Sequence, residues 1–316
     1  TTLRGDVARH EAALIDNEKD TERLDLLAEA TRRFIDVVVD QERLMIARDR
    51  LALAESTARI VGERVTIGKS PDTERRRVRI AVARAKTELE HAEHELATSR
   101  LKLATQWGRI EADFSSAQAR LFDLQPVGSF NTLAQELEGN PDLIRHATEK
   151  RLAEARLRLA QSRRKTDIEL IGGVRYHKVS EDSALVLSAS IPLGKRSRAA
   201  PAIESSQVLS ERHPLLYRQK QLELHASLYE IYQELLHARI AARSLREQII
   251  PEAELALGDY EKGYRSGRYS LLELSDAQQT LLEARLEAVM TAANYHNLRI
   301  EIERLTGQAM STGGSQ

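Results

Sequence analysis

The stretch that decides the fold is residues 260–279, YEKGYRSGRYSLLELSDAQQ, inside a longer segment from Pro251 to Gly307. Apolar residues recur at helical spacing on both sides of it, while Gly263 to Gly267 has the residue types of a turn. The pattern predicts a helix that ends near residue 261, a turn over 263–267, and a returning helix over 270–305 that closes at Gly307.

The same arrangement occurs earlier in the chain, at an offset of 199 residues. Gly68 corresponds to Gly267, Gly108 to Gly307, and Glu74 to Glu273. Repeats of this kind indicate that one structural unit occurs twice. We therefore expect a first repeat over 1–108, a mixed helix-and-loop segment over 109–140, a second repeat over 141–307 and a disordered tail over 308–316. The first repeat has no counterpart of the opening helix and strand pair, which predicts that the natural protein has tens of residues before Thr1.

The helices that meet at these turns are unusually long. Residues 4–65 have a helical apolar pattern without Gly or Pro from 7 to 61, which corresponds to about 90 Å of helix. A second helix is expected over 72–106. Another very long helix is expected over 197–261, with Pro201, Pro214 and Pro251 as kinks or breaks. A shorter helix is predicted from Pro141 to residue 164, capped by Asn140.

The apolar period changes between the helices of the second repeat. Residues 167–176 and 183–193 alternate as short strands, with a polar turn over 177–182. Leu185, Leu187, Ala189 and Ile191 should share one face of the second strand. The sequence therefore predicts a β-hairpin over 167–193.

Composition excludes several classes of protein. The 316 residues have a net charge of −1, 30% charged and 4% aromatic side chains, and no cysteine. A near-neutral chain does not recruit nucleic acid through a global field, and without cysteine it has neither disulfides nor thiolate metal sites. No apolar run is long enough for a transmembrane helix, and no signal peptide is visible at the start.

Taken together, these motifs resemble the TolC-like outer-membrane efflux family, and more closely its CzcC-type metal-efflux branch. The resemblance rests on YxxGYxxG at 260–267, LLELSDAQ at 271–278, ERLTG at 303–307 and NPDL at 140–143. It implies a mainly α-helical homotrimer. Antiparallel coiled-coil helices would form a periplasmic α-barrel, and the strands would join a twelve-stranded β-barrel in outer-membrane lipid. The partners implied are a periplasmic adaptor and an inner-membrane pump, with no enzymatic activity, cofactor, metal site or nucleic acid.

The resemblance also implies functional residues at the helical turns. Glu273 and Asp276 resemble the acidic pair that rings the tunnel entrance, where mutual repulsion should raise some pKa values. Tyr264 and Glu74 resemble a tyrosine and its acidic partner that latch the closed tip. A linking arginine is expected two residues after Gly267, but Tyr269 stands there with Arg268 beside it.

Other interpretations of the same residues remain open at this point. Glu273 and Asp276 are also ordinary acids for a first helical turn, and Tyr264 could simply pack the turn. His91 and His94 could bind a metal, although a solvated helix face is the commoner arrangement. Gly68-Lys69-Ser70 lacks the spacing of a phosphate-binding loop. Besides an efflux duct, the composition alone would suit a soluble coiled-coil scaffold or adaptor, and no catalytic constellation supports an enzyme.

Overall fold

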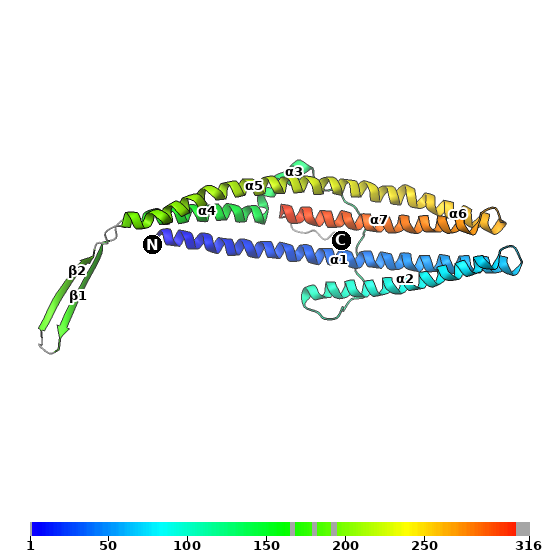
Figure 1. Cartoon of the computed structure of the whole chain (residues 1–316), viewed down its shortest axis with the longest axis horizontal. Helices are drawn as coiled ribbons and strands as arrows, with labels where there is room; N and C mark the ends of the chain where they lie inside the picture. The colour runs from blue at the N-terminus through cyan, green and yellow to red at the C-terminus, as the bar shows by residue number, and fades with distance from the viewer. Residues whose placement is uncertain (1, 165–167, 179–181, 191–194, 308–316) are drawn as a thin grey trace. The chain divides into compact units, whose positions relative to one another are not determined.

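The computed structural model describes residues 2–164, 168–178, 182–190 and 195–307 (Figure 1). The helices that form the long hairpins are α1 (Thr2–Thr66), α2 (Asp72–Ala104), α5 (Lys195–Ser244), α6 (Ile250–Ser266) and α7 (Leu271–Thr306). The remaining elements are η1 (Thr105–Trp107), α3 (Phe130–Glu136), η2 (Leu137–Gly139), α4 (Pro141–Ser162), β1 (Glu169–His177), β2 (Asp182–Ser190) and the π-helical turn η3 (Leu245–Ile249). The predicted long helices, short helix and strand pair are confirmed. The predicted tail over 308–316 lies outside the described residues.

Two predictions about the long helices are wrong. Neither Pro201 nor Pro214 breaks α5, because a proline removes only one backbone hydrogen bond and the helix continues on either side. A kink at either proline stays a prediction. Pro251, the third predicted position, does stand at an interruption: the π-helical turn η3 ends at Ile249, and Pro251 is the second residue of α6. A wider π-helical turn gives the proline ring room where it would clash with the carbonyl four residues earlier.

The second wrong prediction concerns the turn after α6. Gly263 belongs to the helix, which continues to Ser266, and the turn begins only at Gly267. Gly263 is buried, and a Cβ placed there would overlap the ring of Tyr269. Its small size therefore serves close packing within a helix, which a sequence pattern does not distinguish from a turn.

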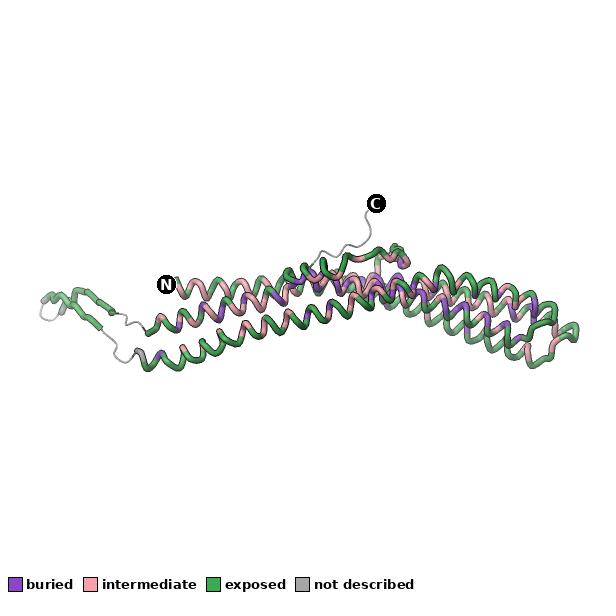
Figure 2. The backbone as a smooth tube through the Cα atoms, turned by 90° about the horizontal axis from the view of Figure 1, so that it is seen from above, coloured by how far each residue is buried: buried purple, intermediate pink, exposed green. Residues whose placement is uncertain are grey.

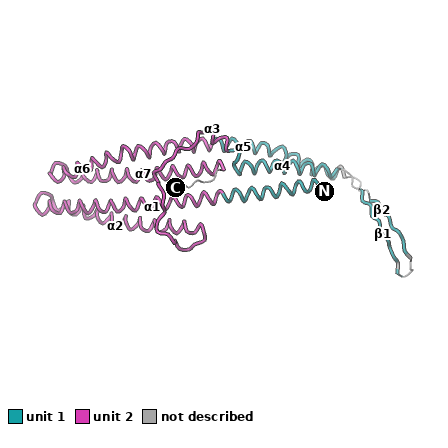
Figure 3. The backbone as a smooth tube through the Cα atoms, turned by 180° about the vertical axis from the view of Figure 1, so that it is seen from behind, with its two compact units in different colours: residues 1–23, 137–225 teal, residues 24–136, 226–316 magenta. Residues whose placement is uncertain are grey.

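The chain divides into two compact units, which are described separately (Figure 3). The first unit comprises residues 1–23 and 137–225, and includes α4 and the strand pair. Asn140 caps α4 as predicted, since its side chain accepts a hydrogen bond from the Leu143 amide. Within this unit Asn17 Nδ2 donates to Thr148 Oγ1 at 3.0 Å, which ties α1 to α4.

The two strands of the first unit pair antiparallel, with Leu170 opposite Ala189, Gly172 opposite Leu187 and Val174 opposite Leu185. Because side chains alternate along a strand, these pairs share one largely apolar face, as predicted for Leu185, Leu187 and Ala189. Leu187 is 79% exposed in the single chain. The apolar face is thus left without cover by the chain's own described residues. Residues 167, 179–181 and 191–193 of the predicted hairpin lie outside those residues.

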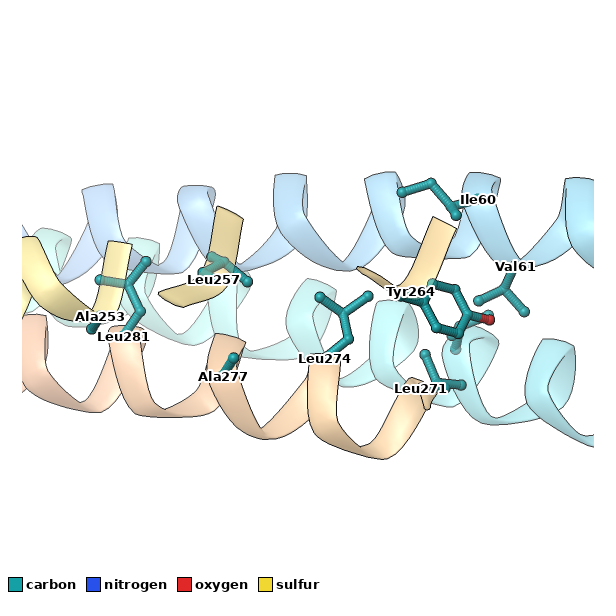
Figure 4. Close-up of a cluster of buried hydrophobic side chains, with 10 residues drawn as sticks. Ile60, Val61, Ala253, Leu257, Tyr264, Leu271, Leu274, Ala277 and Leu281 are labelled. Atoms are coloured by element: carbon teal, nitrogen blue, oxygen red, sulfur yellow. The ribbon is translucent and has the colours of Figure 1, made fainter. Parts of the chain in front are cut away.

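The second unit comprises residues 24–136 and 226–316, and its described residues include the two hydrophobic clusters that follow. Buried positions alternate with exposed ones along its helices (Figure 2), as narrow apolar stripes on amphipathic helices require. One cluster lies where the helices turn, and includes Val61, Tyr264 and Leu274 (Figure 4). The other joins α1 and α7 to the irregular segment before α3, and includes Ile35, Leu121 and Ala292.

Side chains of the long helices hold that irregular segment in place. Gln41 on α1 makes two hydrogen bonds to the backbone of Ala117, one as donor at 2.9 Å and one as acceptor at 2.7 Å. On α7, the Tyr295 hydroxyl donates to the Gln125 carbonyl. These bonds satisfy backbone groups that have no ladder or helix partner. Among the described residues, none of the helices combines the length and apolar character needed to cross a membrane.

Candidate functional site

The two helical hairpins of the second unit end in turns with the same backbone geometry. Gly68 and Gly267 both have positive φ, at 71° and 79°. After them, the Lys69 amide bonds the Arg64 carbonyl and the Arg268 amide bonds the Gly263 carbonyl, both at 2.7 Å. This six-to-one bond, together with a left-handed glycine, is the Schellman ending of a helix. Gly108 and Gly307 likewise share positive φ, at 74° and 68°. The predicted division of the chain at residues 108 and 140 stays a prediction.

Tyr264 lies between the two turns and joins them. Only 2% of the residue is exposed, and its ring packs in the hydrophobic cluster with Val61 and Leu271 (Figure 4). Its hydroxyl donates a 2.9 Å hydrogen bond to Oε2 of Glu74 on α2. Burial raises the pKa of Tyr264 above its ordinary value of 10.0, so the phenol stays protonated and able to donate at neutral pH. The structure therefore brings together the tyrosine and the acid that the sequence had singled out.

Arg64, near the end of α1, is a residue at this junction that the sequence analysis missed. Its Nη1 donates to the carbonyls of Tyr264 at 2.8 Å and Arg265 at 3.1 Å, at the end of α6. Its Cζ also lies 4.7 Å from the centroid of the Tyr264 ring. A cation that bonds the last carbonyls of another helix caps that helix and balances its dipole. The sequence did contain one signal that could have drawn attention to Arg64. At the repeat offset it corresponds to Gly263, which belongs to the YxxGYxxG motif of the second copy.

Glu74 and Glu273 occupy equivalent positions in the repeat but have different local roles. Ser270 caps α7 and forms a capping box with Glu273, whose carboxylate accepts from the Ser270 amide at 2.7 Å and its hydroxyl at 2.8 Å. In the first hairpin the cap position is Pro71, which makes no side-chain cap bond. The Glu74 carboxylate is therefore not engaged in a capping box and accepts the Tyr264 hydroxyl instead.

The predicted acidic pair lies at the start of α7. Glu273 and Asp276 are both exposed, and neither forms an ion pair within the ranges that the structure describes. Three residues apart, they lie on the same side of the helix. The bonds from the Ser270 amide and hydroxyl hold the pKa of Glu273 below its ordinary value of 4.5. This lowering of the pKa is opposite to the rise expected from a ring of carboxylates. It is a property of the single chain, whereas the ring needs carboxylates from further subunits.

Among the described residues, neither Arg268 nor Tyr269 has a hydrogen bond or ion pair to the first hairpin, and their part in a latch stays a prediction. The Tyr269 ring packs over Gly263 and lies 4.7 Å, between centroids, from the ring of Tyr260. Arg268 is exposed and has no ion pair in the described part of the chain. Within that part, no group of three or more His, Asp or Glu side chains is arranged to hold a metal ion, and this includes the His91 and His94 region.

Long antiparallel helical hairpins, a strand pair with an uncovered apolar face, and paired glycine turns are the features expected of the channel-forming export proteins that the motifs resemble. Sequence comparison gives the particular family. The profile described as outer membrane efflux protein matches residues 132–308, so the chain belongs to that family. The predicted resemblance is thereby confirmed.

Individual relatives agree with this assignment. The chain is 25% identical over 286 residues to the cobalt-zinc-cadmium resistance protein CzcC of Cupriavidus metallidurans, a match that covers 90% of this chain and 68% of that protein. It is 23% identical over 280 residues to the pyoverdine export outer membrane protein OpmQ of Pseudomonas putida, covering 84% of this chain and 58% of that protein.

Solved structures share the fold. The outer-membrane channel OprN superposes with a TM-score of 0.83 at 14% identity, covering 96% of this chain and 71% of that one. The outer membrane protein VceC of Vibrio cholerae gives a TM-score of 0.77 at 15% identity, covering 98% and 76%. The chain is accordingly an outer-membrane efflux channel component with a periplasmic part, and not an enzyme. Members of this family are trimeric and work with adaptor and pump partners. The scaffold interpretation is set aside.

Proposed function

We propose that this chain forms the passive exit duct of a tripartite system that exports divalent metal cations, and that the hairpin tips are its gate. The observation that carries the proposal is the junction at Tyr264, which joins the ends of the two hairpins. Two exposed carboxylates, Glu273 and Asp276, begin the helix beside that junction. A homotrimer would place three such pairs around one axis, where a ring of negative charge concentrates cations and repels anions.

The cargo proposal draws on similarity as well as on charge. The relative named for cobalt, zinc and cadmium resistance matches a larger share of this chain than the relative named for pyoverdine export does. Divalent cations are attracted to a carboxylate ring, whereas an anionic cargo would be repelled by it. In the proposed mechanism the inner-membrane pump supplies the energy. The adaptor docks on the tips, breaks the junction at Tyr264 and lets the cation diffuse outward.

The apolar face of the strand pair is the observation that supports a membrane-embedded end of the proposed duct. Its apolar face, with Leu170, Val174 and Leu187, would meet lipid, while the opposite face has the polar Arg175 and Ser188. One hairpin leaves two open edges, which a bilayer does not tolerate. Strands from the other copies would join these two in a closed barrel.

The deciding experiment is ion conductance of the trimeric channel in planar bilayers, with Glu273→Gln/Asp276→Asn compared with wild type. Glutamine is also a capping-box residue, so this variant removes charge while keeping the start of α7 intact. We expect reversal potentials to show cation selectivity in wild type and a clear loss of it in the variant. Glu230→Gln/Glu234→Gln, with two exposed acids on α5, is the matched control and should retain selectivity.

Three outcomes would count against parts of the proposal. Unchanged selectivity in the tip variant would move the charge filter elsewhere in the duct. Loss of selectivity in both variants would indicate a general surface-charge effect. For the cargo, a strain deprived of its own channel should regain resistance to zinc, cobalt or cadmium on expression of the wild-type protein. Failure to do so, with channels present in bilayers, would reject metal cations as the cargo.

A further inference from the structure

A cavity of about 540 Å³ lies in the second unit, where the end of α5 and η3 meet the irregular segment before α3. Pockets that bind small molecules have volumes of about 300–1,000 Å³, so this cavity is large enough for one. One wall is the chain from Phe122 to Pro126, and the other includes Arg239, Arg243 and Arg246. None of its lining residues belongs to the hairpin tips, so the proposed gate does not account for the cavity.

The three arginines reach the cavity because of their spacing along the chain. Arg243 follows Arg239 by four residues and Arg246 follows by three more, which places all three on one helical face. Arg246 belongs to η3, and π-helical turns are frequent at functional sites. The three side chains start over about 10 Å of helix, which suits a ligand with acidic groups at more than one point.

Two of these arginines have no acidic partner. In the described part of the chain, neither Arg239 nor Arg246 forms an ion pair, and Arg239 Nε is buried without a hydrogen-bond partner. A buried N–H group without an acceptor is unfavourable. A carboxylate against the edge of this guanidinium would accept from Nε and a terminal nitrogen together. Arg243 differs, because it lies 3.8 Å from the carboxylate of Glu247.

Phe122 orients the guanidinium of Arg246. The Cζ atom of Arg246 lies 4.4 Å from the centroid of the Phe122 ring. A guanidinium that lies over a ring keeps N–H groups at its edge, where they can bind a planar carboxylate. The segment that contains Phe122 is itself anchored, since the Tyr295 hydroxyl donates to the Gln125 carbonyl. A wall held in place before binding reduces the entropy cost of binding a ligand.

Acids near the cavity leave a small excess of positive charge. Three arginines and two acids, Asp123 and Glu247, line it. Asp123 Oδ1 already accepts a hydrogen bond from Gln125 Nε2 at 2.5 Å. On α1, burial raises the pKa of Glu42 and the charge of Arg246 lowers it, so this acid also senses the arginine. The donors that stay available are those of two separate guanidinium groups, which calls for two separate carboxylates.

We propose that this cavity binds a small organic anion with two or more carboxylate groups, one at the edge of Arg239 and another at the edge of Arg246. The carbon skeleton between them lies against Leu124 and Pro126, which also line the cavity. Because the walls come from η3 and from the irregular segment, the bound anion ties these two parts of the second unit together. A ligand that binds only the folded protein raises its melting temperature.

The test uses tricarballylate as the probe and the detergent-solubilised trimer as the receptor. Tricarballylate has several carboxylates on a short carbon chain and lacks the hydroxyl with which citrate chelates metals. Calorimetric titration at fixed ionic strength gives its affinity, and inorganic sulfate is the compact anion for comparison. We expect tricarballylate to bind at least about tenfold more tightly than sulfate, and the melting temperature to rise with its concentration.

Substitutions test the two unpaired arginines. Arg239→Gln/Arg246→Gln should weaken tricarballylate binding about tenfold or more. Arg239→Lys/Arg246→Lys keeps the charge without the planar edge, so its affinity should lie between those of wild type and the glutamine variant. Arg212→Gln/Arg218→Gln is the matched control, with two exposed arginines of α5 that do not line the cavity. It should change the affinity by less than about twofold.

Several results would overturn the inference. Equal affinity for tricarballylate and sulfate would indicate an adventitious ion only. Equal weakening by the control would indicate a general effect of surface charge, and full affinity in the glutamine variant would place binding elsewhere. Absence of binding to the wild-type trimer would reject the site outright. Bilayer conductance is measured on each protein separately, so failure of the site is distinguished from failure of the duct.

Discussion

The hydroxyl of Tyr264 donates a 2.9 Å hydrogen bond to the carboxylate of Glu74, 190 residues earlier in the chain. The two residues belong to different helical hairpins, and Arg64 covers the same tyrosine ring while bonding the carbonyls behind it. A single side chain is therefore buried in a core, bonded to an acid and stacked by a cation. Breaking any one of these contacts should affect how tightly the two hairpins hold together.

The first prediction isolates the hydroxyl. Tyr264→Phe keeps the ring and its packing but removes the donor to Glu74, so we expect the free energy of unfolding to fall by about 1 kcal/mol. The open probability of the channel in bilayers should rise several-fold. Tyr269→Phe is the control, because that ring packs over Gly263 and its hydroxyl has no hydrogen bond among the described residues. Unchanged gating in Tyr264→Phe would show that the bond is structural only.

A second prediction concerns the guanidinium of Arg64. Arg64→Lys keeps the charge, but an ammonium cannot reproduce a planar group whose Nη1 bonds two carbonyls of α6 while its Nε and Nη2 bond Ser70 Oγ and the Lys69 carbonyl. We expect the free energy of unfolding to fall by about 1–2 kcal/mol. Denaturant titration, monitored by the helical circular dichroism signal, measures this loss. Arg59→Lys, at an exposed position on the same helix, should be neutral. Equal stability of the two variants would mean that the cap at the end of α6 contributes little.

The third prediction exchanges the cap of the first hairpin for that of the second. Pro71 already has the extended backbone of a cap residue, with φ −73° and ψ 154°. Pro71→Ser should therefore form a capping box with Glu74 and draw its carboxylate away from Tyr264. We expect a higher open probability, measured in bilayers. In the Tyr264→Phe background the same substitution should add little, and full additivity would show that the carboxylate does not move.

The fourth prediction addresses Gly263. An added Cβ would overlap the Tyr269 ring, so Gly263→Ala should lower the free energy of unfolding by about 1–3 kcal/mol despite the better helix propensity of alanine. Gly258→Ala, on the same helix with open space around it, should instead stabilise by about 0.5–1 kcal/mol. Thermal unfolding followed by circular dichroism measures both. Gly263→Ala/Tyr269→Ala relieves the overlap, and failure to recover stability would contradict the packing argument.

A fifth prediction follows from the capping box at Glu273. Bonds from Ser270 lower the pKa of this carboxyl, so the ionised form is favoured by folding. The resulting stabilisation is present at neutral pH and is lost as the pH falls below the ordinary value of 4.5. Glu273→Gln lacks this titration. The difference in melting temperature between wild type and variant should therefore shrink between about pH 5 and pH 3, and a constant difference would contradict the assignment.

Local signals in the sequence predicted much of the fold correctly. Glycines at 68, 108, 267 and 307 stood at matching positions, and each has the left-handed backbone that ends a helix. Asn140 before Pro141 indicated the start of α4, and alternation of Leu185 and Leu187 indicated their shared face. Each of these signals depends on neighbours within a few residues, which is why it can be read without a structure.

Side-chain contacts in space could not be obtained in that way, whether the residues are near in the sequence or far apart. Gly263 looked like a turn residue until the ring of Tyr269 was seen to occupy the space of its missing side chain. Glu74 and Glu273 are equivalent in the repeat, yet one accepts a bond from another hairpin while the other caps its own helix. The residue type at the two matching positions is the same, and the difference lies at the preceding cap, which is Pro71 in one copy and Ser270 in the other.

The sequence by itself determined the long helices, the places where they end and the strand pair, because propensity, capping and apolar period are local properties of the chain. Only the tertiary structure decided that Arg64 caps α6, that η3 precedes Pro251, and that arginines of α5 and η3 line one cavity. The physical reason is that hydrogen bonds, ring packing and charge pairing depend on distances of a few ångströms between atoms, whereas the residues concerned stand up to about two hundred positions apart.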